Sequence, residues 1–236
     1  MQKKFIYEQI AFDYHLTLER RKTIAVHVHP DQSVKVKAPL HAKDDKINAF
    51  LLRKIRWVLK HQRYFAKFKP RTPKEYISGE TFRYLGRNYK LLVRPTPERE
   101  KVSLQHGKLT VLTLQPGNNL HTQKLLERWY KEKARIIFEE RLTICAARFF
   151  LDCPPALSIR RMTSRWGSYS SKTHKVSLNL ELIKASRTHI DYILIHELCH
   201  ITHRSHNKAF YQLLSSHLPE WIKLKTDLEC SLLSGG

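Results

Sequence analysis

Apolar and polar residues alternate along much of the first forty positions of the chain. The segments 15–20 (HLTLER), 24–28 (IAVHV) and 33–37 (SVKVK) show this two-residue period, with a turn sequence, HPDQ, between the second and the third. In such segments the valines face a core and the lysines face water, which is typical of a half-buried antiparallel sheet. The alternation ends at Pro39 and predicts an antiparallel, β-rich N-terminal part.

A helical period replaces the alternation after Asp44 and Asp45, two residues that favour the first turn of a helix. We predict a helix over residues 46–69, because apolar side chains recur there every three or four positions. Basic side chains cover the rest of this helix, with Trp57 and Tyr64 among them. Such a face can bind nucleic acid, but more often it serves only to solvate the helix.

Two β-hairpins are predicted next in the chain. One covers 80–93 and turns near Gly86, and the other joins 101–105 to 108–114 through His106-Gly107. The turn-rich segment QPGNN at 115–119 follows them and is the best candidate for a domain boundary.

Helical patterns dominate the second half of the chain. Short strands are expected there only on either side of the segment RWGSYSSKTH, at 157–161 and 175–180, whereas helices are expected over 121–150, 187–203, 207–217 and after Pro219. The predicted fold is therefore α+β, with a basic, β-rich domain over 1–118 and a mostly helical domain over 119–236. No internal repeat is visible, and nothing indicates an oligomeric state.

The charge of the chain is strongly positive. Lys and Arg number 43 against 21 Asp and Glu, which gives a net charge of +22. Residues 1–119 hold 25 basic and 10 acidic side chains, a net charge of +15 in that half alone. This field attracts anions, so the N-terminal half is a candidate surface for nucleic acid, although the same charge can act through solubility alone.

The composition also limits where the protein works. The four cysteines, Cys145, Cys153, Cys199 and Cys230, form no C-x-x-C pair, which is typical of a reducing compartment. The N-terminus has no apolar run of a signal peptide, and no stretch has the roughly 20 apolar residues that cross a bilayer. We therefore expect a cytoplasmic protein with no membrane partner.

The candidate chemistry lies in HELCHITHRSH at 196–206, which contains the pattern H-E-x-x-H. Histidines four positions apart, such as His196 and His200, lie on one face of a helix and can bind the same zinc ion. Glu197 lies about 100° further round that helix, where its side chain can reach a zinc-bound water without ligating the metal. We therefore predict Glu197 as the general base.

A catalytic zinc needs a third protein ligand and an open position. A continuing helix would carry His203 too far along its axis to join His196 and His200 on one ion. His206 is better placed if the helix ends near 203 and the chain doubles back, with His203 as a turn residue at positive φ. The other possibility is that His203 and His206 are both surface histidines.

Beyond H-E-x-x-H, the sequence resembles the YgjP-like metallopeptidase-domain family of predicted metal-dependent hydrolases over nearly the whole chain. The similarity rests on six segments: KTIAVHVHPDQSVKVKAP at 22–39, GETFRYLGRNYKLLV at 79–93, RWGS at 165–168, SLNLEL at 177–182, DYILIHELCH at 191–200 and HNKAF at 206–210. Tyr169 and Asn207 depart from the family pattern, in which cysteine and serine are usual at these places.

The resemblance implies a gluzincin-like core in the C-terminal domain, with His196, His200 and His206 as ligands of one zinc ion and Glu197 as the base. The expected function is thus a zinc-dependent hydrolase, a metallopeptidase whose zinc-bound water is activated by Glu197, with a peptide or an anionic small molecule as substrate. Arg165 is a candidate for holding a substrate carboxylate or phosphate, or else it pairs with a carboxylate of the protein.

Two other functions are open on the sequence. The basic N-terminal half favours a metal-dependent phosphohydrolase that acts on nucleotides, although three histidines suit zinc better than magnesium. The same half is also compatible with a protease that acts on nucleic-acid-associated proteins. A purely structural metal is less favoured, because such sites are usually closed by four ligands.

Overall fold

The computed structural model of the chain describes residues 1–29, 31–66, 73–151, 153–162 and 165–233. These residues form helices and three mixed β-sheets, so the protein belongs to the α+β class, as predicted. The chain divides into two compact units, Met1–Thr72 and Pro73–Leu232. Each unit has its own hydrophobic core.

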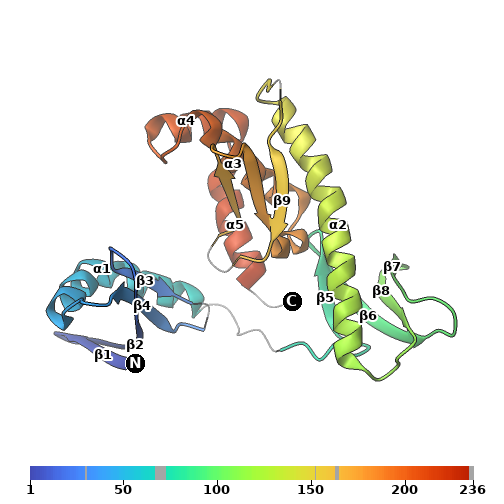
Figure 1. Cartoon of the computed structure of the whole chain (residues 1–236), viewed down its shortest axis with the longest axis horizontal. Coiled ribbons are helices and arrows are strands. Elements are labelled where there is room, and N and C mark those ends of the chain that lie inside the picture. Colours follow the sequence, from blue (N-terminus) through green and yellow to red (C-terminus); the bar gives the residue numbers. More distant parts are fainter. Residues whose placement is uncertain (30, 67–72, 152, 163–164, 234–236) are drawn as a thin grey trace. The chain divides into compact units, whose positions relative to one another are not determined.

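The first unit is a four-stranded sheet with one helix against it (Figure 1). Its elements are β1 (Gln2–Tyr7), β2 (Ile10–Glu19), β3 (Ala25–Val28), β4 (Val34–Pro39) and α1 (Asp44–Phe65). The alternation in β4 buries Val34, Val36 and Ala38, which face the fully buried Ile47, Leu51 and Val58 of α1 in one core. Of the helix predicted over 46–69, residues 67–69 and the side chain of Tyr64 lie outside the described part.

The strand pairing corrects the antiparallel arrangement that we predicted for this part. The order is β1-β2-β4-β3, and β2 pairs with β4 in parallel, from Tyr14 opposite Val34 to Glu19 opposite Pro39. Side chains alternate with the same two-residue period in parallel and antiparallel strands, so the pattern cannot specify the partner. Here β3 takes the outer edge and leaves β4 beside β2.

The second unit begins with a sheet of the same topology. Its strands are β5 (Thr81–Tyr84), β6 (Arg87–Pro95), β7 (Lys101–Gln105) and β8 (Lys108–Thr113), in the order β5-β6-β8-β7 with a parallel pair in the middle. The long helix α2 (Asn119–Ala147) follows this sheet, as α1 follows the first. The fold therefore repeats a pattern of one sheet followed by one helix. The sequence shows no corresponding repeat, because strand pairing does not require identical residues.

The rest of the second unit adds another sheet and three helices. The 3-10 helix η1 (Leu180–Lys184) connects the last strand of this sheet to the first of these helices. The strands are β9 (Ala156–Arg160), β10 (Gly167–Ser170) and β11 (Lys175–Asn179), and the helices are α3 (Arg187–Thr202), α4 (Lys208–His217) and α5 (Trp221–Leu233). The order β10-β11-β9 makes β10 an edge strand. Figure 1 shows α3 beside this sheet, and the contacts of α3 with β10 and β11 place it there.

The position expected for a domain boundary, after residue 118, lies inside the second unit. Phe82, Leu91 and Leu109 of the hairpin sheet share one buried cluster with Leu126 of α2 and Leu194 of α3. A turn-rich segment shows where the chain reverses, whereas a domain boundary requires that few contacts cross it. No helix in the described part of the chain is long and apolar enough to span a membrane.

Candidate metal centre

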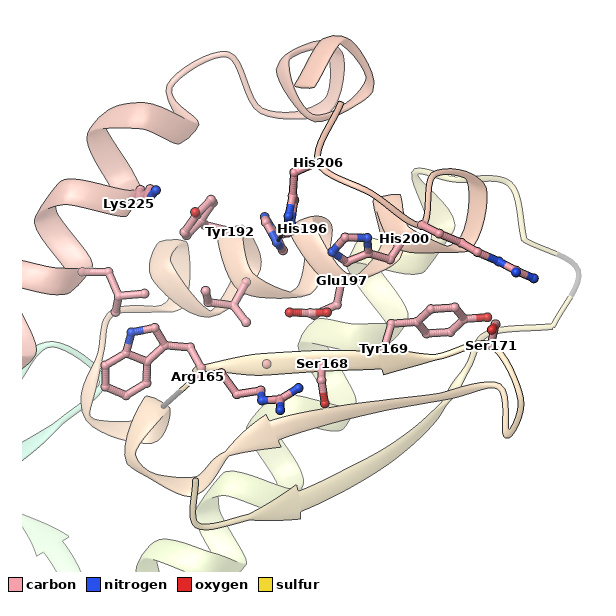
Figure 2. Close-up of a pocket in the computed structure, with 15 residues that line it drawn as sticks. Arg165, Ser168, Tyr169, Ser171, Tyr192, His196, Glu197, His200, His206 and Lys225 are labelled. Atoms are coloured by element: carbon pink, nitrogen blue, oxygen red, sulfur yellow. Dashed lines mark hydrogen bonds between the residues drawn. The ribbon is translucent and has the colours of Figure 1, made fainter. Parts of the chain in front are cut away.

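Helix α3 presents two histidines on one face. It begins after Ser186, whose side chain accepts a hydrogen bond from the backbone N–H of His189, and it ends at His203. Half of its sixteen residues are buried against the neighbouring elements, while His196 and His200 stand one turn apart with ring centroids 5.2 Å from each other. The helical spacing of H-E-x-x-H thus produces the shared face expected from it (Figure 2).

The chain turns back after α3 and brings His206 to the same place. The Nε2 atoms of His206 and His196 are 3.0 Å apart. One ring nitrogen from each of His196, His200 and His206 lies within 4.8 Å of the others, and we call these residues the histidine triad. Figure 2 shows the three rings pointing toward one another.

Phe210 packs behind the triad. It is fully buried, and its ring centroid lies 5.0, 4.7 and 4.7 Å from those of His196, His200 and His206. Its backbone N–H donates to the side chain of Asn207, which caps α4. The start of α4 therefore fixes the residue that supports all three rings, a role that the HNKAF segment did not reveal by its pattern.

His203 lies outside the triad and contributes its backbone instead. Its carbonyl oxygen is 2.9 Å from Nδ1 of His200. Because a carbonyl only accepts, Nδ1 of His200 carries the proton and Nε2 keeps its lone pair for a metal. The positive φ that we expected at His203 is wrong: its φ is −122°, because α3 ends in an extended residue rather than a left-handed one.

The donor set fits a zinc ion. Burial, followed by the neighbouring His200 and His206, lowers the pKa of His196 to about 4, so this ring is neutral at pH 7 and able to ligate. Burial also lowers the pKa of His206. Nitrogen ligands of a tetrahedral zinc at 2.0–2.1 Å stand about 3.3 Å apart, close to the 3.0 Å between the facing Nε2 atoms.

Glu197 lies beside the triad and is almost entirely enclosed, with 6% of its surface exposed. Burial raises the pKa of its carboxyl to about 7, opposed by a hydrogen bond from the backbone N–H of Tyr169 and by the positive charge of Arg165. Figure 2 shows the carboxylate between α3 and strand β10. A carboxylate with this pKa can both take up and release a proton near neutral pH.

Gly167 allows β10 to pass this close to Glu197. A Cβ atom at Gly167 would lie 2.8 Å from Oε1 of Glu197 and 2.8 Å from Cγ2 of Ile193, closer than side chains tolerate. Sequence reasoning missed this residue, because no strand was expected within RWGSYSSKTH, whereas the structure places β10 inside that segment. A glycine within a strand is a known sign of close backbone approach.

A pocket of about 580 Å³ opens over the triad and β10. Its lining includes three basic side chains, Arg165, Arg204 and Lys225, and Glu197 is its only acidic residue. None of the three basic residues has a salt-bridge partner among the described residues. The pocket is therefore cationic, and the sequence had indicated only Arg165 of these three.

The two residues of the RWGS segment that we weighed separately behave differently. Trp166 is half-buried and packs against the core while also lining the pocket. Arg165 is exposed, and the structure does not pair it with a carboxylate within salt-bridge distance in the described part. Its guanidinium is thus available to a substrate.

Comparisons with known proteins identify the family of the chain. A family model described as "YgjP-like, metallopeptidase domain" matches residues 22–230. The metallopeptidase zymogen abylysin of Pyrococcus abyssi is 20% identical, with a TM-score of 0.39 over 42% of this chain and 97% of its own. The zymogen jannalysin of Methanocaldococcus jannaschii is 18% identical, with a TM-score of 0.37 over 40% of this chain and 89% of its own. No curated protein matches the chain.

Proposed function

The chain belongs to the YgjP-like metallopeptidase-domain family, and we propose that it is a zinc peptidase in which the histidine triad holds one zinc ion and Glu197 is the general base. Family membership makes the protein a metal-dependent hydrolase. The observation that carries the finer proposal is the convergence of three imidazoles beside one enclosed carboxylate at a pocket.

The choice of zinc rests on the ligand chemistry. Three imidazole ligands suit zinc, whereas magnesium prefers oxygen ligands. Three protein ligands also leave a fourth position open, as catalytic zinc sites do. When bound, zinc would polarise the scissile carbonyl and make a water molecule more acidic. The cytoplasm is the proposed compartment, in keeping with three free cysteines in the described residues.

Glu197 is held in position for proton transfer. The backbone N–H of Tyr169 donates to its carboxylate, and the close approach of Gly167 restricts its side chain. In the proposed reaction Glu197 takes the proton of the attacking water and passes it to the leaving amine.

Strand β10 offers a place for an extended peptide. Among the described strands it pairs with β11 alone, and three of its residues, Gly167, Ser168 and Tyr169, line the pocket. Backbone groups on the open edge of a sheet can add a further strand, which is a common mode of peptide recognition. We propose that the substrate backbone lies along β10, next to the triad.

The cationic lining favours one alternative. Arg165, Arg204 and Lys225 would also suit a phosphate, so a metal-dependent phosphohydrolase acting on nucleotides is the second candidate. A protease acting on nucleic-acid-associated proteins is a variant of the first candidate. In either, Arg165 would bind an anionic group of the substrate, so Arg165→Ala should raise KM more than it lowers kcat.

The test of the proposal is Glu197→Gln in the zinc-loaded protein. The amide is nearly isosteric but a far weaker base, so turnover should fall by roughly 10²–10⁴-fold while about one zinc per chain and the melting temperature are retained. Turnover is measured on whichever substrates a panel of peptides and nucleoside triphosphates identifies. Glu181→Gln, the same change at a glutamate outside the pocket, serves as the control.

The outcomes separate the possibilities. Near-normal turnover of Glu197→Gln with zinc bound would show that Glu197 is not the base. Cleavage of triphosphates but of no peptide would assign the phosphohydrolase instead, since both reactions use the same base.

A further inference from the structure

One side of α1, next to its buried face, carries a line of basic and aromatic side chains. They recur at alternating spacings of four and three residues, which places them along one side of the helix. We call this line the α1 stripe; it consists of Lys46, Phe50, Arg53, Trp57 and Lys60. No acidic residue occurs between Lys46 and Ala66, so nothing within the helix beyond its first turn neutralises the stripe.

The segment before β3 extends the stripe into a cationic hollow. A pocket of about 440 Å³ there is lined by Lys22, Lys46 and Arg53, with Ile24 and Phe50 among its apolar residues. The pocket lining contains no acidic residue. None of these three cations has a salt-bridge partner in the described part of the chain.

Trp57 is an ordered aromatic platform within the stripe. Its side chain is 40% exposed, which is high for a tryptophan. The ring of His61 stacks on it with centroids 4.0 Å apart and an interplanar angle of 32°. Nδ1 of His61 donates to the backbone carbonyl of Trp57 at 2.8 Å, so the imidazole is fixed where it supports the indole.

We propose that the first unit binds single-stranded nucleic acid along the α1 stripe. The phosphates contact Lys22, Lys46, Arg53 and Lys60, and a base stacks on the exposed indole of Trp57. Cationic grooves with exposed aromatic rings are the usual means of binding single strands without sequence preference. The inference is independent of the hydrolase site, since every residue used lies in the first unit.

Two other anionic partners fit the stripe less well. A membrane-binding helix inserts its apolar face, but the apolar face of α1, with Ile47, Leu51 and Val58, is fully buried in the core. Duplex DNA offers phosphates but keeps its bases stacked, so it would leave Trp57 without a role. An exposed tryptophan among cations is best explained by an unpaired base.

The experiment uses the full-length protein and a fluorescent dT20 oligonucleotide, with anisotropy titrations at several salt concentrations. One variant replaces Lys46, Arg53 and Lys60 with Gln, and a second is Trp57→Ala. The control replaces Lys124, Arg128 and Lys131, three exposed cations on one side of α2, with Gln. The control removes the same charge from a helical surface in the other unit.

The expected results are quantitative. Each phosphate neutralised on a single strand contributes about −0.7 to the slope of log K against log salt. The stripe variant lacks three cations, so its slope should be less negative by about 2. Trp57→Ala should weaken binding about 5-fold or more without changing the slope, while Trp57→Phe restores part of the loss. The control should bind like the unmodified protein, and circular dichroism should show all variants folded.

Several outcomes would overturn the proposal. Equal loss of binding in the control would mean that overall charge alone attracts the oligonucleotide. If Trp57→Ala bound dT20 normally, or if the protein bound duplex DNA as tightly as dT20, the proposal that a base stacks on Trp57 would be wrong. Binding to phosphatidylserine vesicles that depends on Trp57, without binding to dT20, would assign the stripe to a membrane surface. Zinc content and turnover stay normal in the stripe variants, so failure here leaves the proposed function unaffected.

Discussion

Replacing Gly167 with alanine tests how the protein positions its carboxylate. The new Cβ would stand 2.8 Å from Oε1 and 2.9 Å from Cγ of Glu197, whereas ordinary contact begins near 3.4 Å. Strand β10 cannot simply withdraw, because it is paired with β11 over four residues and the carbonyl of Trp166 accepts from Asn179. Either the strand or Glu197 must therefore move by more than half an ångström.

Two effects of different size should follow. Overpacking of this kind costs about 1–3 kcal/mol, which for a unit of this length corresponds to a melting temperature lower by about 2–12 °C. Catalysis should suffer more, since a misplacement of about 1 Å at a reacting group can cost on the order of 10²-fold. The three atoms nearest to the new Cβ belong to Glu197 and Ile193 and not to the triad, so zinc binding should be retained.

The assay compares zinc content, melting temperature and turnover of Gly167→Ala with those of Ser170→Ala. Ser170 lies in the same strand but outside the pocket, so its variant controls for any change in β10. If Gly167→Ala had the same turnover and melting temperature as the unmodified protein, the claim that β10 lies too close to Glu197 for a side chain would be refuted. Loss of zinc together with activity would refute the claim that the effect acts through Glu197.

Three further predictions concern the metal and its support. Alanine at any member of the histidine triad should abolish most zinc binding measured by mass spectrometry. His203→Ala should keep it, because His203 lies outside the triad and bonds to His200 through its backbone carbonyl; the reverse result would contradict the ligand set. Chelation should lower the melting temperature and added zinc restore it, since a ligand at 100 times its Kd stabilises by about 2.7 kcal/mol; an unchanged temperature would argue against the site. Arg141→Met should lower the free energy of unfolding, measured in urea, by about 1.5–3 kcal/mol. The reason is that Asp191 of α3 loses two hydrogen bonds of 2.7 and 2.6 Å, in a pair whose side chains are only about 15% exposed. A loss below about 0.5 kcal/mol would show that this pair does not hold α2 to α3.

The features that could be predicted from the sequence depend on residues close together along the chain. Strand alternation and helical spacing place β4, α1 and α3, and the four-residue interval puts His196 and His200 on one face. The reversal that brings His206 to them was expected because a straight helix could not supply a third ligand. The role of these residues as zinc ligands stays a prediction.

The features that could not be predicted depend on contacts between distant segments. Gly167 and Glu197 are thirty positions apart, and only packing of β10 on α3 makes the glycine necessary. Phe210 reads as one more apolar residue of a helix until the triad is seen to rest on it. The parallel pairs at the centres of two sheets arise in the same way, since a period of two describes a strand and not its neighbour.

The division into two cores has a consequence for synthesis on the ribosome. The first unit can close once α1 has emerged, because its buried cluster, as far as the structure describes the chain, ends at Val58. The hairpin of β5 and β6 must wait, since Leu85 and Gly86 bond to the backbone of η1 and the same core closes only with Leu228. At about 5–20 residues per second this delay lasts about 7–30 s. During that time the nascent chain contains a folded, cationic first unit followed by apolar strands that are not yet packed. We therefore expect chaperones to bind mainly to β5–β8.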